Sequence, residues 1–292
     1  MLEELNLQRE PDWEPDYREP DEEARPRDPV IDEAKEALRR FFDAERAEVF
    51  YQRQLTIMFE QTYFHWITAR ALTELAAEGH IAADVEPLPP TGTITLYRAT
   101  GHRYWRRQAQ EIIELVTQFS AHTFTEGIGA QGEMLFEAAF GGAGFRVTGR
   151  KVRAYGGRNW GETGHDLDRV FERDGVAYGA EIKNTLPYIP RDEFDVKRRM
   201  CRHLGLRPLF IVRMAPKSYI NDVWQEGGYT LVFKFQLYPF GQKQFADRVR
   251  ERLRIPVDCP ARIADGTVQR FENWHVRRLP RPAAADEGEP RV

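Results

Sequence analysis

The chain has 292 residues, with 42 basic and 46 acidic side chains and a formal net charge of −4. This length fits one large domain or two smaller ones, and we expect two. Two cysteines, no ligand-like histidine spacing, no signal peptide and no apolar run of about 18 residues argue against a disulfide scaffold, a structural zinc site and a membrane span. We expect a cytoplasmic protein with reduced thiols.

The two ends of the chain differ in composition from its body. Residues 1–33 carry thirteen acidic side chains against four arginines, a net charge of −9, which leaves +5 on the other 259 residues. Residues 1–32 and 279–292 have few aliphatic side chains and many prolines, so we expect two disordered tails, the first of them acidic. A modestly basic body is compatible with a nucleic-acid partner but does not require one.

Residues 33–125 are expected to form a mainly helical domain. Apolar residues recur at helical spacing from Asp32 to Gly79 and predict three amphipathic helices. After a Pro-rich link, residues 93–98 alternate like a strand. This layout resembles the winged-helix DNA-binding fold, in which residues 63–78 would form the recognition helix. An all-helical interaction or dimerisation module capped by one hairpin is the alternative.

An arginine- and aromatic-rich stretch connects this hairpin to the next helix. Its arginines would suit phosphate contact, and the rings of Tyr97, Tyr104 and Trp105 would suit base stacking. The alternative is a solvated face of a linker helix that continues through Val116. The side chains expected to contact nucleic acid in this domain are Arg70, Arg98, Arg103, Arg106 and Arg107.

Residues 126–278 change to a mixture of helices and strands. A strand, a helix and a strand in succession imply a parallel pair, so we expect an α/β domain with a mixed sheet. The expected elements are a helix over 131–140, strands over 144–152, 166–172 and 176–183, a helix over 191–204, strands over 208–213 and 229–235, and a helix over 242–253.

The most informative stretch of this domain is a predicted hairpin. Asp and Gly at 174–175, between runs of β-forming residues, predict a tight two-residue turn. Residues equidistant from that turn face each other, which places Asp168 opposite Glu181. Opposed carboxylates destabilise a sheet unless a cation lies near them. Lys183 projects from the same face, and this combination suits a Mg²⁺ ion that holds a phosphate and activates water.

Residues 129–214 resemble the PD-(D/E)xK nuclease superfamily, which includes type II restriction endonucleases, Mrr-like enzymes and archaeal Holliday junction resolvases. The resemblance rests on Glu133, four residues after a glycine, on Asp168, and on Glu181-Ile182-Lys183. It implies a restriction-endonuclease-like core, ordered α-β-β-β-α-β around a mixed sheet. No proline precedes Asp168. The absence of this proline is common in the resolvase-like branch.

The resemblance also implies a role for each of these residues. Asp168, Glu181 and the backbone carbonyl of Ile182 would hold Mg²⁺, for which Mn²⁺ could substitute, and Glu133 would complete the metal shell. Lys183 would orient or deprotonate the attacking water, or neutralise the developing charge. The expected catalytic residues are therefore Glu133, Asp168, Glu181 and Lys183.

Neighbouring residues leave alternatives open. Asp166 is either a second metal ligand or the ion-pair partner of Lys183, and we favour the ion pair. Glu137 competes with Glu133 one helical turn later, and His165 is either a turn residue or a contact to DNA or water. Around the metal ligands we expect Asp166, His165 and Asn184, and along the path of a backbone phosphate we expect Tyr188, Lys197 and Arg198.

The expected function is that of a Mg²⁺-dependent DNA endonuclease acting on duplex DNA. We expect no membrane among its partners, and a homodimer is one expected form. One alternative is a DNA-binding regulator or scaffold with a non-catalytic nuclease-like domain, and another is the same chemistry on RNA or branched DNA. This type of core serves several pathways, so the sequence does not indicate which one.

Overall fold

The computed structural model describes residues 28–90 and 92–279. The expected disordered tails lie almost wholly outside these residues. The exception is helix α1 (Val30–Ala44), which begins inside the expected N-terminal tail. Its first turn buries Ile31 and carries two acidic side chains, which stabilise a helix N-terminus. Residues 30–32, which the composition assigns to the tail, are therefore helical.

The described residues form two compact units. The first comprises residues up to 124 together with Arg248–Ile255, and the second comprises residues 125–247 and the chain from Pro256. The end of helix α8 (Lys243–Leu253) thus belongs to the first unit, whereas the sequence predicts one continuous domain over 126–278. Ion pairs within the first unit join Arg252 to Glu48 and Glu111, and Arg254 to Glu45.

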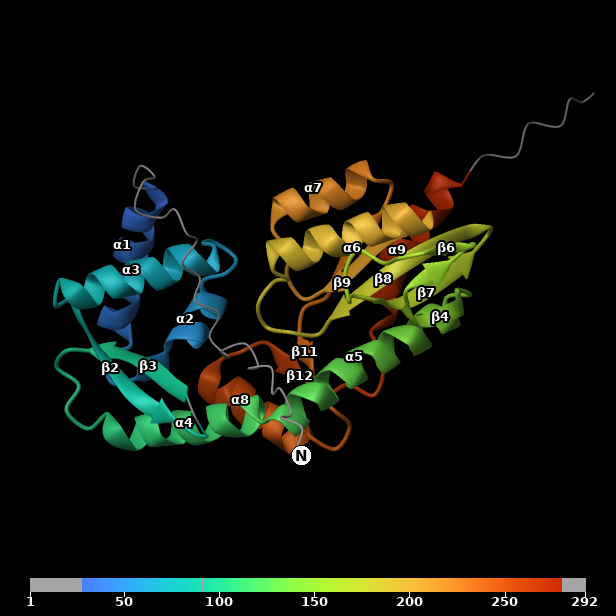
Figure 1. Ribbon diagram of the computed structural model, residues 1–292. Helices are drawn as coiled ribbons and strands as arrows, with labels where there is room; N and C mark the ends of the chain where they lie inside the picture. Colours follow the sequence, from blue (N-terminus) through green and yellow to red (C-terminus); the bar gives the residue numbers. More distant parts are fainter. Residues whose placement is uncertain (1–27, 91, 280–292) are drawn as a thin grey trace, which may run out of the picture. The chain divides into compact units, whose positions relative to one another are not determined.

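The first unit is a small sheet packed against helices (Figure 1). Its three strands are antiparallel in the order β1-β3-β2. Helices α1 and α3 bury Leu38, Phe42, Leu72 and Leu75 in a common core. In chain order the elements are α1, β1 (Val49–Tyr51), α2 (Gln52–Met58), α3 (His65–Ala77), β2 (Ile81–Leu88), β3 (Gly92–Ala99) and α4 (Arg106–Ser120).

Two strands of this unit are not among the expected elements. The segment read as a Pro-rich link is strand β2, which pairs with β3 along its whole length, from Ile81 opposite Ala99 to Leu88 opposite Gly92. Its Pro87 is tolerated because β2 lies at the sheet edge, where a missing backbone N–H costs no ladder hydrogen bond. Strand β1 is only three residues long, too short for a periodic signal.

The second unit has a five-stranded sheet in the order β10-β9-β8-β7-β4. Strands β8, β9 and β10 run parallel, while β7 and β4 are antiparallel to their neighbours. The expected α/β class with a mixed sheet is confirmed. The elements are α5 (His122–Gly142), β4 (Arg146–Val152), β5 (Ala154–Tyr155), β6 (Arg158–Asn159), β7 (Leu167–Arg173), β8 (Val176–Lys183), α6 (Arg191–Leu204), β9 (Arg207–Val212), α7 (Lys217–Gln225), β10 (Tyr229–Val232), β11 (Gln236–Leu237), α8, β12 (Val257–Asp258) and α9 (Asp265–Arg278).

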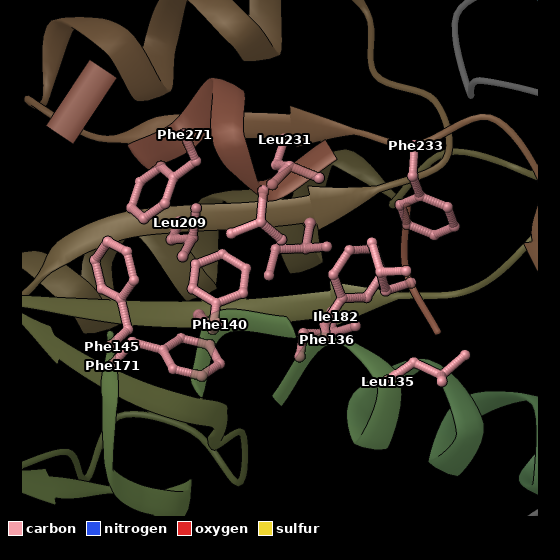
Figure 2. Close-up of a cluster of buried hydrophobic side chains, with 14 of the residues drawn as sticks. Leu135, Phe136, Phe140, Phe145, Phe171, Ile182, Leu209, Leu231, Phe233 and Phe271 are labelled. Carbon is pink, nitrogen blue, oxygen red and sulfur yellow. The ribbon is translucent and has the colours of Figure 1, made fainter. Parts of the chain in front are cut away.

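Helices cover both faces of this sheet (Figure 1). On one face α5 and α9 pack an aromatic core, in which Phe140 meets Phe171 and Phe271, and Phe136 meets Phe233 (Figure 2). On the other face, α6 and α7 bury smaller clusters. Helices α7 and α9 are not among the expected elements. Helix α9 buries few apolar side chains, so its sequence shows no clear helical periodicity.

The β7–β8 hairpin has the register expected from its turn. Phe171 lies opposite Tyr178, and the two turn residues, Asp174 and Gly175, have φ values of +52° and +72°. Helix α9 fixes this turn, because His275 contacts Asp174 through Nε2 at 3.1 Å and the Tyr178 hydroxyl through Nδ1 at 2.8 Å. The two strands therefore present their side chains at defined positions.

Candidate active site

Two buried acids from the hairpin form the centre of the site. Asp168 on β7 is 7% exposed and Glu181 on β8 is 1% exposed. The backbone ladder ends at Arg169 opposite Ala180, and beyond it the Ile182 amide donates to Asp168 Oδ2 at 2.8 Å. The Asp168 carboxylate thus takes the place of a backbone acceptor, which fixes its orientation toward β8.

Glu181 is surrounded by charges of both signs. Its Oε1 lies 3.1 Å from Lys183 Nζ and its Oε2 lies 2.6 Å from Lys197 Nζ. Burial and the nearby charge of Asp168 nevertheless raise the pKa of Glu181, and the two lysines offset this only in part. A further positive charge near Asp168 and Glu181 would therefore stabilise both carboxylates.

Lys183 is held by two glutamates. Its ammonium lies 3.1 Å from Glu181 Oε1 and 2.7 Å from Oε1 of Glu193 on α6. Burial lowers the pKa of Lys183, but the two glutamates outweigh burial, and the pKa is raised. The expected pairing of Lys183 with Asp166 is wrong, because Glu193 takes that place and the Asp166 carbonyl instead accepts a hydrogen bond from Lys197.

Glu133 reaches this centre from α5, on the other side of the sheet. Its Oε2 lies 2.8 Å from Arg169 Nη1, and its Oε1 lies 3.4 Å from Lys151 Nζ. Lys151 Nζ is also 3.2 Å from Asp168 Oδ1. Glu133 is therefore linked to Asp168 through one ammonium group.

Glu137 lies one helical turn after Glu133 and has different partners. It shares Arg169 with Glu133, at 2.6 Å from Nε, but its other partner is Arg150. Its hydrogen bond with Arg150, together with Arg169, holds the pKa of Glu137 below its ordinary value despite burial. No ion pair of the described residues links Glu137 to the lysine that contacts Asp168, so the geometry favours Glu133 as the glutamate of this site.

The donors at this centre suit a hard cation. In the described part of the chain, no three acidic, histidine or cysteine side chains converge closely enough to hold a metal ion. Mg²⁺ needs no such cage, since proteins usually hold it with one or two carboxylates plus water and substrate phosphate. Asp168, Glu181 and the carbonyl of Ile182 supply oxygen donors of this kind.

Two residues expected beside the ligands or near DNA are buried and bonded to other groups of the protein. Lys197 is 5% exposed and is engaged by Glu181, so it cannot reach a passing phosphate. Asn184 is buried and ties the end of β8 to other segments, since its Nδ2 donates to the carbonyls of Ile128 and Leu237 at 2.7 and 2.6 Å. A Cβ at Gly132 would lie 2.7 Å from Asn184 Cβ, so α5 packs closely here because this residue is glycine.

The other expected neighbours have contacts of their own. Arg198 pairs with three acidic side chains of α6 and its surroundings, namely Asp195, Asp222 and Glu226, so it is not available as a free cation. His165 is exposed and its Nδ1 lies 2.9 Å from Thr163 Oγ1. The ring of Tyr188 packs edge-on against that of Tyr219 at 6.5 Å.

The arginines expected to contact nucleic acid in the first unit divide into two groups. Arg70 bonds Glu74 and Arg98 bonds Asp84, so both are already paired. By contrast, three arginines at the start of α4 are exposed and have no ion pair with a described residue, and Tyr104 beside them is 88% exposed. These three are Arg103, Arg106, whose guanidinium lies 5.1 Å from the Trp105 ring centre, and Arg107.

Three charged residues of the site are absent from the sequence prediction. Arg169 directly follows Asp168, and strand alternation alone could place its side chain on the α5 face. Glu193 comes from α6, and only the packing of that helix brings it to Lys183. Lys151 follows a register shift between Val147 and Gly149 in the β4–β7 pairing, and counting along the sequence cannot anticipate such a shift.

Comparisons with protein-family models, with curated proteins and with solved structures give no match to this chain. The chemistry and placement of these side chains are therefore the basis for assigning a function.

Proposed function

We propose that the protein is a metal-dependent nuclease that hydrolyses phosphodiester bonds of DNA as an endonuclease. The observation that carries the proposal is the hairpin that brings Asp168, Glu181 and Lys183 together, with a raised pKa on the buried glutamate. The order α5, β4, β7, β8, α6, β9 also supports a restriction-endonuclease-like core. Free thiols at Cys201 and Cys259 agree with the proposed cytoplasmic location.

In this proposal the acids hold the cation. Asp168, Glu181 and the carbonyl of Ile182 would bind Mg²⁺ or Mn²⁺, with Glu133 close by. When bound, the ion lowers the pKa of a coordinated water and screens the phosphate from the carboxylates. The Ile182 amide keeps the Asp168 carboxylate in place, and the burial of Glu181 excludes bulk water from its carboxylate.

Lys183 supplies a positive charge at the edge of the same site. Glu181 and Glu193 favour its ammonium form, which stabilises negative charge on a phosphate oxygen and has no free site to accept a proton. Its side chain is only partly buried. We therefore assign Lys183 to charge stabilisation rather than to proton abstraction.

The proposal is tested by incubating the full chain with supercoiled, linear, single-stranded and four-way-junction DNA, and with RNA, in Mg²⁺, Mn²⁺ or EDTA. We expect nicking or linearisation of supercoiled DNA with either metal, none with EDTA, and a loss of about 10²–10³-fold in the Lys183→Ala variant. Preferred cleavage of RNA or junctions would reassign the substrate. Cleavage that persists in EDTA, or is unchanged in Lys183→Ala, would contradict the site, and a lack of cleavage would favour a non-catalytic scaffold.

The first unit supports a role in DNA binding. Three helices, with the short strand β1 among them, precede a two-stranded hairpin in a sheet ordered β1-β3-β2, which supports a winged-helix-like module. Arg103, Arg106 and Arg107, which form no ion pair with a described residue, and the exposed ring of Tyr104 form a corner at the start of α4. We place the phosphate contacts of this unit at that α4 corner.

A protein-binding role for the same unit is the second candidate. The helix in the recognition position, α3, exposes one arginine, Arg70, and this arginine bonds Glu74. Phe64 is exposed just before that helix, and the β2–β3 hairpin carries the acidic Glu86. Acidic and apolar surfaces of this kind do not attract a phosphate backbone and would suit a protein partner.

Replacing Arg103, Arg106 and Arg107 together with alanine should weaken DNA binding by at least about tenfold at low salt. If each arginine contacts one phosphate, the slope of log K against log salt should fall in magnitude by about 2–3. Fluorescence anisotropy with a labelled duplex measures both quantities, and Arg70→Ala is the control, because Arg70 is already paired. If only Arg70→Ala weakens binding, α3 is the contact element, and if the wild type shows no affinity at low salt, the unit binds protein.

A further inference from the structure

Lys151 joins two acidic residues of the proposed site. Its Nζ lies 3.2 Å from Asp168 Oδ1 and 3.4 Å from Glu133 Oε1. These acids come from β7 and α5, on different layers of the unit. Among the described residues, Lys151 is the one side chain that forms ion pairs with both carboxylates. Its ammonium thus provides, between these two acids, the positive charge that a metal ion would otherwise provide.

The backbone holds Lys151 in an unusual conformation. Its backbone φ is +49°, in the left-handed region that residues other than glycine rarely adopt. The strand reaches this point through the register shift near Gly149, where an added Cβ would lie 2.4 Å from Val152 Cγ2. Strained backbone of this kind is found at functional sites, where the surrounding structure maintains it.

Lys151 is also more exposed than the other cations of the site and can leave its carboxylate partners more easily. Its side chain is 58% exposed. Arg169 is buried and bound to Glu133, Glu137 and the Asp168 carbonyl, and Lys197 is buried against Glu181. Lys151 can therefore exchange its two carboxylates for water, while the buried cations would each leave several groups without partners.

We propose that Lys151 is a built-in counter-ion, which neutralises Glu133 and Asp168 in the metal-free protein and is displaced when a divalent cation binds. The inference rests on the proposed metal site. Metal binding must then break both ion pairs of Lys151 and overcome the repulsion of its ammonium. Removal of this side chain should consequently tighten metal binding and make the metal-free protein less stable.

Titration of the full chain with Mn²⁺ by isothermal calorimetry tests this inference. We expect the Kd for Mn²⁺ to fall by about three- to tenfold in Lys151→Met. Lys151→Arg keeps the charge and should bind as the wild type does. Arg150→Met is the matched control, because Arg150 is the preceding residue, is similarly exposed and pairs with Glu137 instead; its Kd should stay within about twofold of the wild type.

Thermal melting of the same proteins gives a second readout without catalysis. Metal-free Lys151→Met should melt below the wild type, and Mn²⁺ should raise its melting temperature by more than it raises that of the wild type. Asp168→Asn should lose Mn²⁺ binding if the proposed metal site is right. An unchanged or weaker Mn²⁺ affinity in Lys151→Met, together with that loss, would overturn the counter-ion role alone. If neither the wild type nor Lys151→Met binds Mn²⁺, both this inference and the proposed function fail.

Discussion

Replacing Lys197 with methionine is expected to lower the free energy of unfolding by about 3–5 kcal/mol, which is the loss typical when one partner of a buried ion pair is removed. Lys197 and Glu181 are both buried, and their charged atoms lie 2.6 Å apart. Methionine has a similar volume but leaves Glu181 with Lys183 as its remaining cation and removes the donor to the Asp166 carbonyl. Urea unfolding at neutral pH measures this loss.

The size of this loss should depend on pH in a defined direction. Burial and Asp168 raise the pKa of Glu181 in the folded protein, and removing a cation raises it further. A carboxyl with a raised pKa binds its proton more tightly in the folded state, so folding becomes more favourable as pH falls. The loss should therefore be largest at neutral pH and above, and should shrink as the pH falls toward the ordinary carboxyl pKa of 4.5.

Two further variants separate this explanation from a general effect of losing a lysine. Lys243 forms an exposed ion pair with Asp247 at 2.9 Å, and Lys243→Met should change the free energy of unfolding by at most about 1 kcal/mol. Adding Glu181→Gln to Lys197→Met should restore part of the stability at neutral pH, because the unpaired charge is gone. If Lys197→Met costs no more than Lys243→Met, the charge of Glu181 does not depend on Lys197.

The hairpin could be predicted from the sequence because its determinants are local. A two-residue turn fixes the register of both strands, and the side-chain period of two then decides which residues share a face. The pairing of Phe171 with Tyr178 confirms this reasoning. The neighbourhood of Asp168 and Glu181 follows from the same count. The order of helices and strands around the hairpin likewise predicted the mixed sheet, since a crossover helix requires a parallel pair.

The surroundings of the acids could not be predicted, because they depend on packing between distant segments. Glu193 rather than Asp166 pairs with Lys183, since α6 lies over the end of β8. A cationic residue on a helix looks like a surface residue in the sequence, yet the same packing buries Lys197. Lys151 meets Asp168 only because a register shift interrupts the pairing of β4 with β7. Sequence periodicity contains none of these relations.

Replacing Asp168 with asparagine is expected to abolish most DNA cleavage while leaving the fold intact. The amide oxygen of asparagine can still accept the hydrogen bond from the Ile182 amide, which the Asp168 carboxylate accepts at 2.8 Å. The negative charge that would hold the cation is lost, however, and metal catalysis depends on several kcal/mol of charge stabilisation. We expect the cleavage rate to fall by about 10³–10⁴-fold under single-turnover conditions.

Stability should move in the opposite direction from activity in this variant. The charge of Asp168 raises the pKa of Glu181, so its removal relieves repulsion between two buried acids and should leave the melting temperature unchanged or higher.

Asp166→Asn is the matched control, two residues earlier in the chain, and should retain activity within a few-fold. A large loss of activity in Asp166→Asn, with Asp168→Asn still active, would identify Asp166 as the metal ligand. A lower melting temperature in Asp168→Asn would instead identify Asp168 as a structural residue. Removing a stabilising side chain lowers the stability of the protein, whereas removing a charged catalytic group commonly does not.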